Sequence, residues 1–163
     1  MSSQDKLQEM RELIDQLDIQ LQDLINQRAA AAQQVAQIKL EEDKDTFFYR
    51  PEREAAILKK IQKRNRGPMG DEEMARLFRE VMSACLALEQ PMNIAYLGPP
   101  GTFTQAAALK HFGHSIKTVS LASIPDVFRE VESGAAHYGV VPVENSTEGV
   151  INHTLDMFIQ SPL

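Results

Sequence analysis

The feature that most constrains this chain is a helical pattern that runs without proline or glycine from residue 5 to residue 40. Apolar residues recur along it at spacings of three and four, which is typical of a helix that packs against another helix along a seam. The seam residues are Leu7, Met10, Ile14, Leu17, Leu21, Leu24, Ala31, Val35 and Ile38. The predicted helix is about 50 Å long, longer than a compact domain of this size. It therefore needs a long partner, and the nearest candidate is a second copy of the chain.

Two shorter helices are predicted to follow the long one. Pro51 fits the first turn of a helix over about 51–64, which residues 65–68 end with glycine and proline. Asp71 is predicted to cap a third helix that ends near Glu89. The three helices together predict an all-helical domain.

Pro91 marks a change of sequence pattern, and we place a domain boundary between 1–91 and 92–163. The second part alternates β-branched runs with helical segments. The predicted order is strand 93–97, helix 104–112, strand 118–120, helix 123–133, strand 138–143 and a last helix after residue 149. This βαβαβα order predicts a three-layer α/β lobe with a parallel sheet. Three strands make a thin sheet, so we expect an incomplete lobe, the opening of a larger domain.

Charge and cysteine content narrow the class of protein. The chain has 163 residues and a formal net charge of −6 at pH 7, which disfavours a general nucleic-acid binder. One cysteine, Cys85, excludes an intramolecular disulfide and fits a reducing cytosol. The sequence shows neither a signal-peptide pattern nor an apolar run long enough to span a bilayer. We expect a cytoplasmic protein with no membrane partner.

Arg28 breaks the apolar seam of the long helix. It occupies the next seam position after Leu24, where a charge is costly unless it is paired. Its helical neighbours at positions 24, 25, 31 and 32 are all apolar. One interpretation is that Arg28 extends to solvent or sets the register of the coil. The other is that it binds a ligand.

Lys39 favours ligand binding. It lies eleven residues after Arg28 and so points within roughly 20° of it. Arg11 lies seventeen residues before Arg28 and points roughly 100° away, toward a partner chain. Arg53 stands at the start of the second helix, where backbone N–H groups also favour an anion. Four such cations indicate a small polyanionic ligand.

Glu89 is a second polar residue on an apolar face. It lies four residues after Cys85 and seven after Met82 in the third helix. One interpretation is a solvated helix end near Pro91, and the other is a carboxyl group that points into the ligand pocket.

These residues carry a resemblance to a known family. The string from Met10 to Lys39 and the string from Pro51 to Glu54 resemble the all-helical class of chorismate mutases, over residues 5–90. The resemblance implies an intertwined homodimer of three-helix chains whose long first helices pair. It also implies rearrangement of chorismate to prephenate, with no metal and no organic cofactor.

The resemblance implies a role for each site residue. Arg28, with Arg11 of the other subunit, would clamp the substrate carboxylates, and Arg53 would assist. Lys39 would donate to the ether oxygen, where charge develops as the C–O bond breaks, and Glu54 would bind the substrate hydroxyl. The rearrangement is unimolecular, so the protein has to select the reactive conformer and stabilise charge on oxygen.

Two positions depart from the bacterial pattern of that family. Cys85 stands where serine is frequent, and Glu89 stands where glutamine is frequent. A glutamine donates a hydrogen bond to the ether oxygen at any pH, whereas Glu89 donates only when protonated. We therefore predict that mutase activity favours mildly acidic pH.

The second part of the chain resembles the start of a prephenate dehydratase. The strings from Ile94 to Ala107 and from Gly139 to Gly149 carry this likeness, and together the two parts resemble the bifunctional mutase–dehydratases of phenylalanine biosynthesis. The resemblance implies that prephenate is bound by Thr102, Asn145, Ser146 and Thr147. The physical alternative for the loop 98–102 is a tight strand-to-helix turn. A nucleotide site is disfavoured, because neither phosphate-loop pattern is present.

That family also needs a Thr-Arg-Phe segment in a second lobe and usually a regulatory domain, which this sequence does not contain. We therefore expect neither dehydratase activity nor phenylalanine feedback from this chain alone.

Two other functions compete with the enzyme: a coiled-coil dimerisation module, and an α/β amino-acid sensor without chemistry. The histidines His111, His114, His137 and His153 lack the spacing of metal ligands, and we predict surface or cap positions for them.

Overall fold

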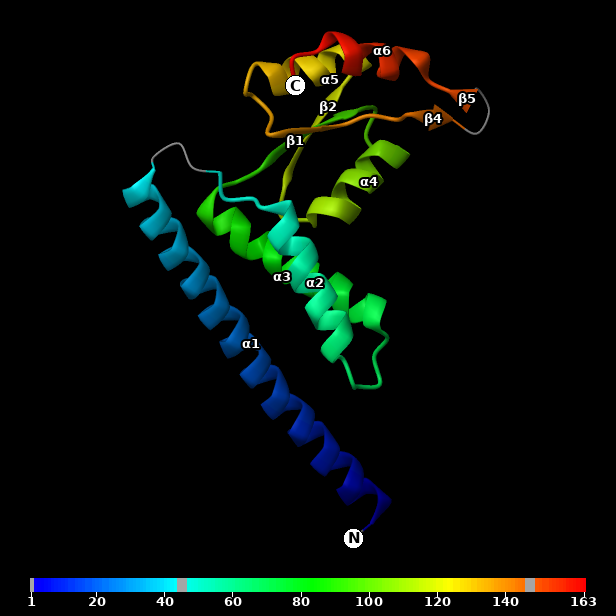
Figure 1. Cartoon of the computed structure of the whole chain (residues 1–163). Helices are drawn as coiled ribbons and strands as arrows, with labels where there is room; N and C mark the ends of the chain where they lie inside the picture. The colour runs from blue at the N-terminus through cyan, green and yellow to red at the C-terminus, as the bar shows by residue number, and fades with distance from the viewer. Residues whose placement is uncertain (1, 44–46, 146–148) are drawn as a thin grey trace. The chain divides into compact units, whose positions relative to one another are not determined.

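The computed structural model describes residues 2–43, 47–145 and 149–163. The chain divides into two compact units, Met1–Phe48 and Tyr49–Leu163. The first unit is dominated by one helix, and the second holds two further helices and an α/β lobe (Figure 1). The boundary predicted after residue 91 stays a prediction.

The first unit contains helix α1, which extends over Ser3–Glu42. It confirms the predicted long helix and begins two residues earlier. Ser2 is the reason, because its hydroxyl accepts from the Asp5 amide at 3.1 Å while Asp5 accepts from the Ser2 amide at 2.7 Å. This reciprocal capping box satisfies two amides that the helix leaves free. At 1.5 Å per residue α1 is about 60 Å long.

The apolar seam of α1 is exposed along most of its length. The exposed fractions of Leu7, Met10, Ile14, Leu17, Leu21, Leu24, Val35 and Ile38 lie between 46% and 60%. A stripe of large apolar side chains of this length is typical of a helix that pairs with another.

The second unit opens with helices α2 (Pro51–Arg64) and α3 (Asp71–Glu89). Their bounds agree with the predicted helices, but the N-cap of α3 is Gly70, and Asp71 is its first helical residue. The predicted cap at Asp71 was therefore wrong by one position. The Asp71 carboxylate accepts from the Asn65 side-chain amide at 2.8 Å instead of capping the helix. The two helices pack through a core of Leu58, Ile61, Ala75 and Met82.

The α/β lobe is built on a three-stranded sheet that is parallel, as predicted, and the structure gives its strand order as β2-β1-β3. The strands are β1 (Asn93–Leu97), β2 (Lys117–Leu121) and β3 (Tyr138–Val140). Helices α4 (Phe103–Phe112) and α5 (Ile124–Glu132) cover opposite faces of the sheet (Figure 1). Consecutive residues of β1 explain this, since Ile94 packs with Ala108 and Phe112 while Ala95 packs with Val127 and Ala136.

The end of the lobe differs from the prediction. The strand expected over 138–143 stops at Val140. Two-residue strands β4 (Glu144–Asn145) and β5 (Gly149–Val150) pair antiparallel, and helix α6 (Asn152–Gln160) follows. The α6 side chain Phe158 lies edge-on against Phe128 of α5, with ring centroids 5.2 Å apart.

Helices α2 and α3 belong to the same compact unit as the lobe, and specific contacts join them. His114 Nδ1 lies 2.8 Å from Glu80 Oε1 of α3, and the His114 amide donates to the other carboxylate oxygen at 3.0 Å. Tyr49, just before α2, packs against Phe112 and Tyr138 of the lobe with ring centroids 5.6 Å away in both cases. Within the described residues, none of the helices meets the length and hydropathy needed to cross a membrane.

Candidate active site

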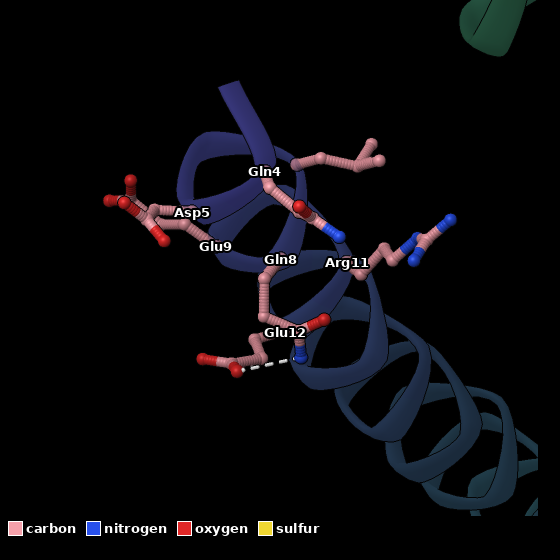
Figure 2. Close-up of a pocket in the computed structure, with 7 residues that line it drawn as sticks. Gln4, Asp5, Gln8, Glu9, Arg11 and Glu12 are labelled. Carbon is pink, nitrogen blue, oxygen red and sulfur yellow. Dashed lines mark hydrogen bonds between the residues drawn. The ribbon is translucent and has the colours of Figure 1, made fainter. Parts of the chain in front are cut away.

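Three of the predicted site cations lie on α1. Arg11 is exposed, and Arg28 and Lys39 are half-buried. Figure 2 shows Arg11 extending away from Asp5 and Glu9, in a surface depression confined to the first turns of the helix. Among the residues that the structure describes, no carboxylate lies within 4.0 Å of Arg11 or Arg28. Neither guanidinium is therefore engaged by a carboxylate of the described residues.

Lys39 has a defined aromatic neighbour in the same unit. Its Nζ lies 5.6 Å from the centroid of the Phe48 ring, within the range in which a cation is attracted to a ring face. Phe48 itself is 9% exposed. The contact restrains a flexible side chain without neutralising its charge, so Lys39 remains a hydrogen-bond donor.

Four predicted site residues lie in the second unit, on α2 and α3. Arg53 is exposed and Glu54 half-buried in the first turn of α2, which begins at Pro51 because proline is tolerated where helix amides lack partners. Cys85 is a buried free thiol of α3, and Glu89 is the half-buried last residue of that helix.

Arg79 is a charged residue that the sequence analysis did not identify. Its Nε lies 3.7 Å from Oε1 of Glu54, and the two side chains are 28% and 18% exposed. The sequence does carry a signal, because Arg79 stands four residues after Ala75 and three before Met82, on the face of α3 that packs against α2. A cation on an apolar helix face is the same feature that singled out Arg28.

The electrostatics of Glu54 follow from burial and from Arg79. Burial raises the pKa of Glu54, and the nearby Arg79 guanidinium opposes that rise. Burial also raises the pKa of Tyr49 to about 12, with the Glu54 charge as the next cause. Tyr49 is therefore a neutral hydroxyl at physiological pH, and Glu54 is the titrating group of this cluster.

The loop after β1 is a tight strand-to-helix turn. A side chain at Gly98 would meet Ser120 Oγ at 2.1 Å, and Gly101 has a φ of +86° that favours glycine. The Thr102 hydroxyl lies 3.3 Å from the Leu97 carbonyl oxygen, to which it donates, and 2.9 Å from the Thr104 hydroxyl. The turn thus fixes the Thr102 hydroxyl at the carboxyl end of β1.

The other predicted prephenate-binding residues are described only in part. Asn145 lies in β4. Ser146 and Thr147 fall outside the described residues. Sequence reasoning missed Gln105, whose side-chain oxygen accepts from the Gly101 amide at 2.7 Å and closes the turn.

Three of the four histidines have defined partners. His137 Nδ1 accepts from the Asn93 amide at 3.0 Å, and His111 Nε2 lies 3.4 Å from the Tyr49 hydroxyl. His114 contacts Glu80, as described above. Among the described residues, no group of three or more His, Cys, Asp or Glu side chains is placed to hold a metal ion.

Comparison with known proteins assigns both parts of the chain to families. Residues 10–90 match the family described as chorismate mutase type II, and residues 94–163 match the family described as prephenate dehydratase.

The chain is also similar to curated proteins named bifunctional chorismate mutase/prephenate dehydratase. The Stutzerimonas stutzeri and Pseudomonas aeruginosa relatives are each 59% identical over 163 residues, covering 98% of this chain and 45% of the relative. The Neisseria gonorrhoeae relative is 51% identical over 153 residues, covering 94% and 41% respectively. The chain spans less than half the length of these relatives.

Proposed function

Residues 10–90 of this chain belong to the type II chorismate mutase family and residues 94–163 to the prephenate dehydratase family, and on that premise we propose that the chain converts chorismate to prephenate in phenylalanine biosynthesis. The observation that carries the proposal is the match over residues 10–90. That segment contains every residue that we assign to the chorismate site. The test is loss of chorismate absorbance with the purified chain.

The proposed chemistry needs fixed charges and no nucleophile. Arg28, with Arg11 of a second copy, binds the two carboxylates of chorismate, and Arg53 adds positive charge at the start of α2. Lys39 donates to the ether oxygen as the C–O bond breaks, which lowers the barrier because the donor is already in place. The Lys39–Phe48 contact supports this role, since it restrains the ammonium group.

Glu54, Cys85 and Glu89 complete the proposed substrate site. The Glu54 carboxylate accepts from the substrate hydroxyl, and Cys85 contributes a small buried surface. Glu89 donates a second hydrogen bond to the ether oxygen when it is protonated. No metal or organic cofactor takes part in this proposal.

We propose that the chain acts as a homodimer through α1 and works in the cytoplasm. The exposed apolar seam of α1 supports the first statement. The buried free thiol of Cys85, which is typical of a reducing compartment, supports the second. A dimerisation module without chemistry is disfavoured, because both parts of the chain match enzyme families.

Mixing two inactive variants tests whether Arg11 acts in the neighbouring copy's site. Arg11→Ala and Arg28→Ala chains are each expected to be nearly inactive as homodimers. Co-refolding equal amounts produces heterodimers in which one of the two sites has both arginines. Since half of the dimers are mixed, the activity should recover to about a quarter of the wild-type value. A mixture no more active than the average of the two variants would contradict a shared site.

The pH dependence of the mutase reaction tests the role of Glu89. We expect kcat/KM to fall from mildly acidic toward alkaline pH, because only the protonated Glu89 donates to the ether oxygen. Glu89→Gln should flatten this alkaline fall, since an amide donates throughout. Initial rates over a series of buffers at constant ionic strength measure both profiles. A flat wild-type profile, or an unchanged profile in Glu89→Gln, would refute the role.

For the second part of the chain, residues 92–163, we propose that it binds prephenate and does not catalyse a second reaction by itself. Thr102, Asn145, Ser146 and Thr147 are the proposed contacts with the carboxylates or the ring hydroxyl. The fixed position of the Thr102 hydroxyl at the carboxyl end of β1 supports this, since ligands of open parallel sheets bind at that edge. The absence of dehydratase activity from this chain alone stays a prediction.

A further inference from the structure

The Arg79–Glu54 pair joins two helices at a half-buried position. Arg79 is on α3, and Glu54 is in the first turn of α2. Removing a guanidinium and a carboxylate from water is costly, and the cost is offset only when the two groups meet with good geometry. Nε lies 3.7 Å from Oε1, within ion-pair distance but longer than a hydrogen bond, and both side chains are less than a third exposed, so the attraction between the two charges is only partly screened by water.

The neighbouring charges of α3 are engaged elsewhere. Glu73 forms a surface ion pair with Arg76 at 2.5 Å, and Glu80 is held by His114 at 2.8 Å. Among the described residues, Glu54 is the carboxylate within ion-pair distance of Arg79. Arg53, beside Glu54 on α2, makes no such contact among those residues. The Glu54 carboxylate is therefore oriented by the opposite helix.

We propose that Arg79 is a positioning residue of the mutase site, which holds the Glu54 carboxylate in the orientation that receives the substrate hydroxyl. The inference rests on the proposed function. A glutamate side chain that is free to rotate loses conformational freedom when substrate binds, and the ion pair imposes that loss before binding. Arg79 acts through Glu54 and makes no contact with the substrate itself.

The charge of Arg79 also sets when Glu54 is ionised. Arg79 on α3 is the charged group that lowers the Glu54 pKa against burial, while burial and the Glu54 charge raise the Tyr49 pKa to about 12, which keeps that neighbouring hydroxyl neutral. Without Arg79, burial acts on the Glu54 pKa unopposed and raises it further. Because Glu54 is proposed to accept from the substrate hydroxyl as a carboxylate, kcat/KM should also fall at acidic pH as Glu54 becomes protonated, and loss of Arg79 should move this acidic limb to higher pH. The alkaline limb assigned to Glu89 should stay where it is.

The test compares Arg79→Gln and Arg79→Lys with wild type in the whole chain. Arg76→Gln is the matched control, because it removes an arginine of the same helix whose ion pair is on the surface. We expect Arg79→Gln to lower kcat/KM for chorismate about tenfold, the effect of losing one charge-assisted contact. Arg79→Lys should recover part of that loss, and Arg76→Gln should stay within about twofold of wild type. Circular dichroism of each variant checks that its helix content matches that of the wild type.

A second series asks whether Arg79 acts through Glu54. In a Glu54→Gln background the further substitution Arg79→Gln should change kcat/KM little, since the group that Arg79 positions is gone. Full additivity of the two losses, or an Arg79→Gln profile identical to wild type, would overturn the inference while leaving the mutase function intact. A wild-type chain that does not consume chorismate would refute the proposed function, and the inference with it.

Discussion

Replacement of Arg28 by alanine is expected to lower kcat/KM for chorismate by about a thousandfold, the effect of removing a preorganised charge from a dry site. Arg28 occupies a seam position of α1 and has no carboxylate partner within 4.0 Å among the described residues. Its planar guanidinium matches a carboxylate with two parallel hydrogen bonds. Initial rates of chorismate loss measure the effect directly.

Two further variants distinguish the effect of the planar Arg28 guanidinium from the effect of a positive charge alone. Arg28→Lys keeps the charge but loses the planar fork, so it should recover only part of the activity. Lys6→Ala removes an exposed cation of the same helix that lies off the seam, and its rate should stay within about twofold of wild type. Equal rates for wild type and Arg28→Ala, with both proteins folded, would mean that the site is elsewhere.

Placing two glutamates in the seam of α1 is expected to abolish dimerisation and to remove most of the mutase activity. Leu17 and Leu21 are about half exposed on the isolated helix, and in a paired helix they would be buried against the partner. Leu17→Glu combined with Leu21→Glu would bury four like charges per dimer, which is far more costly than dissociation. We expect a monomer by light scattering and a loss of kcat/KM of about a hundredfold or more, because Arg11 of the second copy is lost.

The control for this experiment is a charge on another face of the same helix. Ile19 is 62% exposed and lies off the seam, so Ile19→Glu should remain dimeric and active. A double variant that stays dimeric would show that the seam is not the interface. A monomeric double variant with wild-type activity would show that one chain contains the whole site.

The helices were predictable because their signals are local. A breaker-free seam predicts α1, and Pro51 together with the glycine and proline of residues 65–68 predicts both ends of α2. The one-residue error at the start of α3 arose from competition for Asp71. Its carboxylate accepts from Asn65, six residues earlier in the chain, and a capping rule that looks only forward does not consider that bond.

The third strand shows that an apolar sequence pattern can overestimate the length of a strand. Residues 138–143 are mostly apolar, yet β3 ends at Val140, where it pairs with Tyr96 of β1. Pro142 follows closely and has no amide to donate to a sheet. Its carbonyl accepts from the buried Thr154 hydroxyl at 2.7 Å instead, which ties the segment to α6. The sequence of residues 138–143 alone indicates neither this hydrogen bond to Thr154 nor the short β4–β5 pairing.

The sequence proposes individual residues for the candidate site but does not indicate how they pair. Helical phasing and family likeness together identified the cations of α1. The Arg79–Glu54 ion pair depends on how α2 packs on α3, and the sequence separates its members by twenty-five residues. The closed Thr102 turn likewise depends on Ser120 of the neighbouring strand, whose hydroxyl excludes any side chain at Gly98.

The most direct test of the mutase assignment is the rate at which the purified wild-type chain consumes chorismate, followed by absorbance with prephenate measured as product. The assignment predicts a rate proportional to protein concentration, one prephenate formed for each chorismate lost, and no requirement for added metal. Chorismate that disappears no faster than in buffer would contradict it.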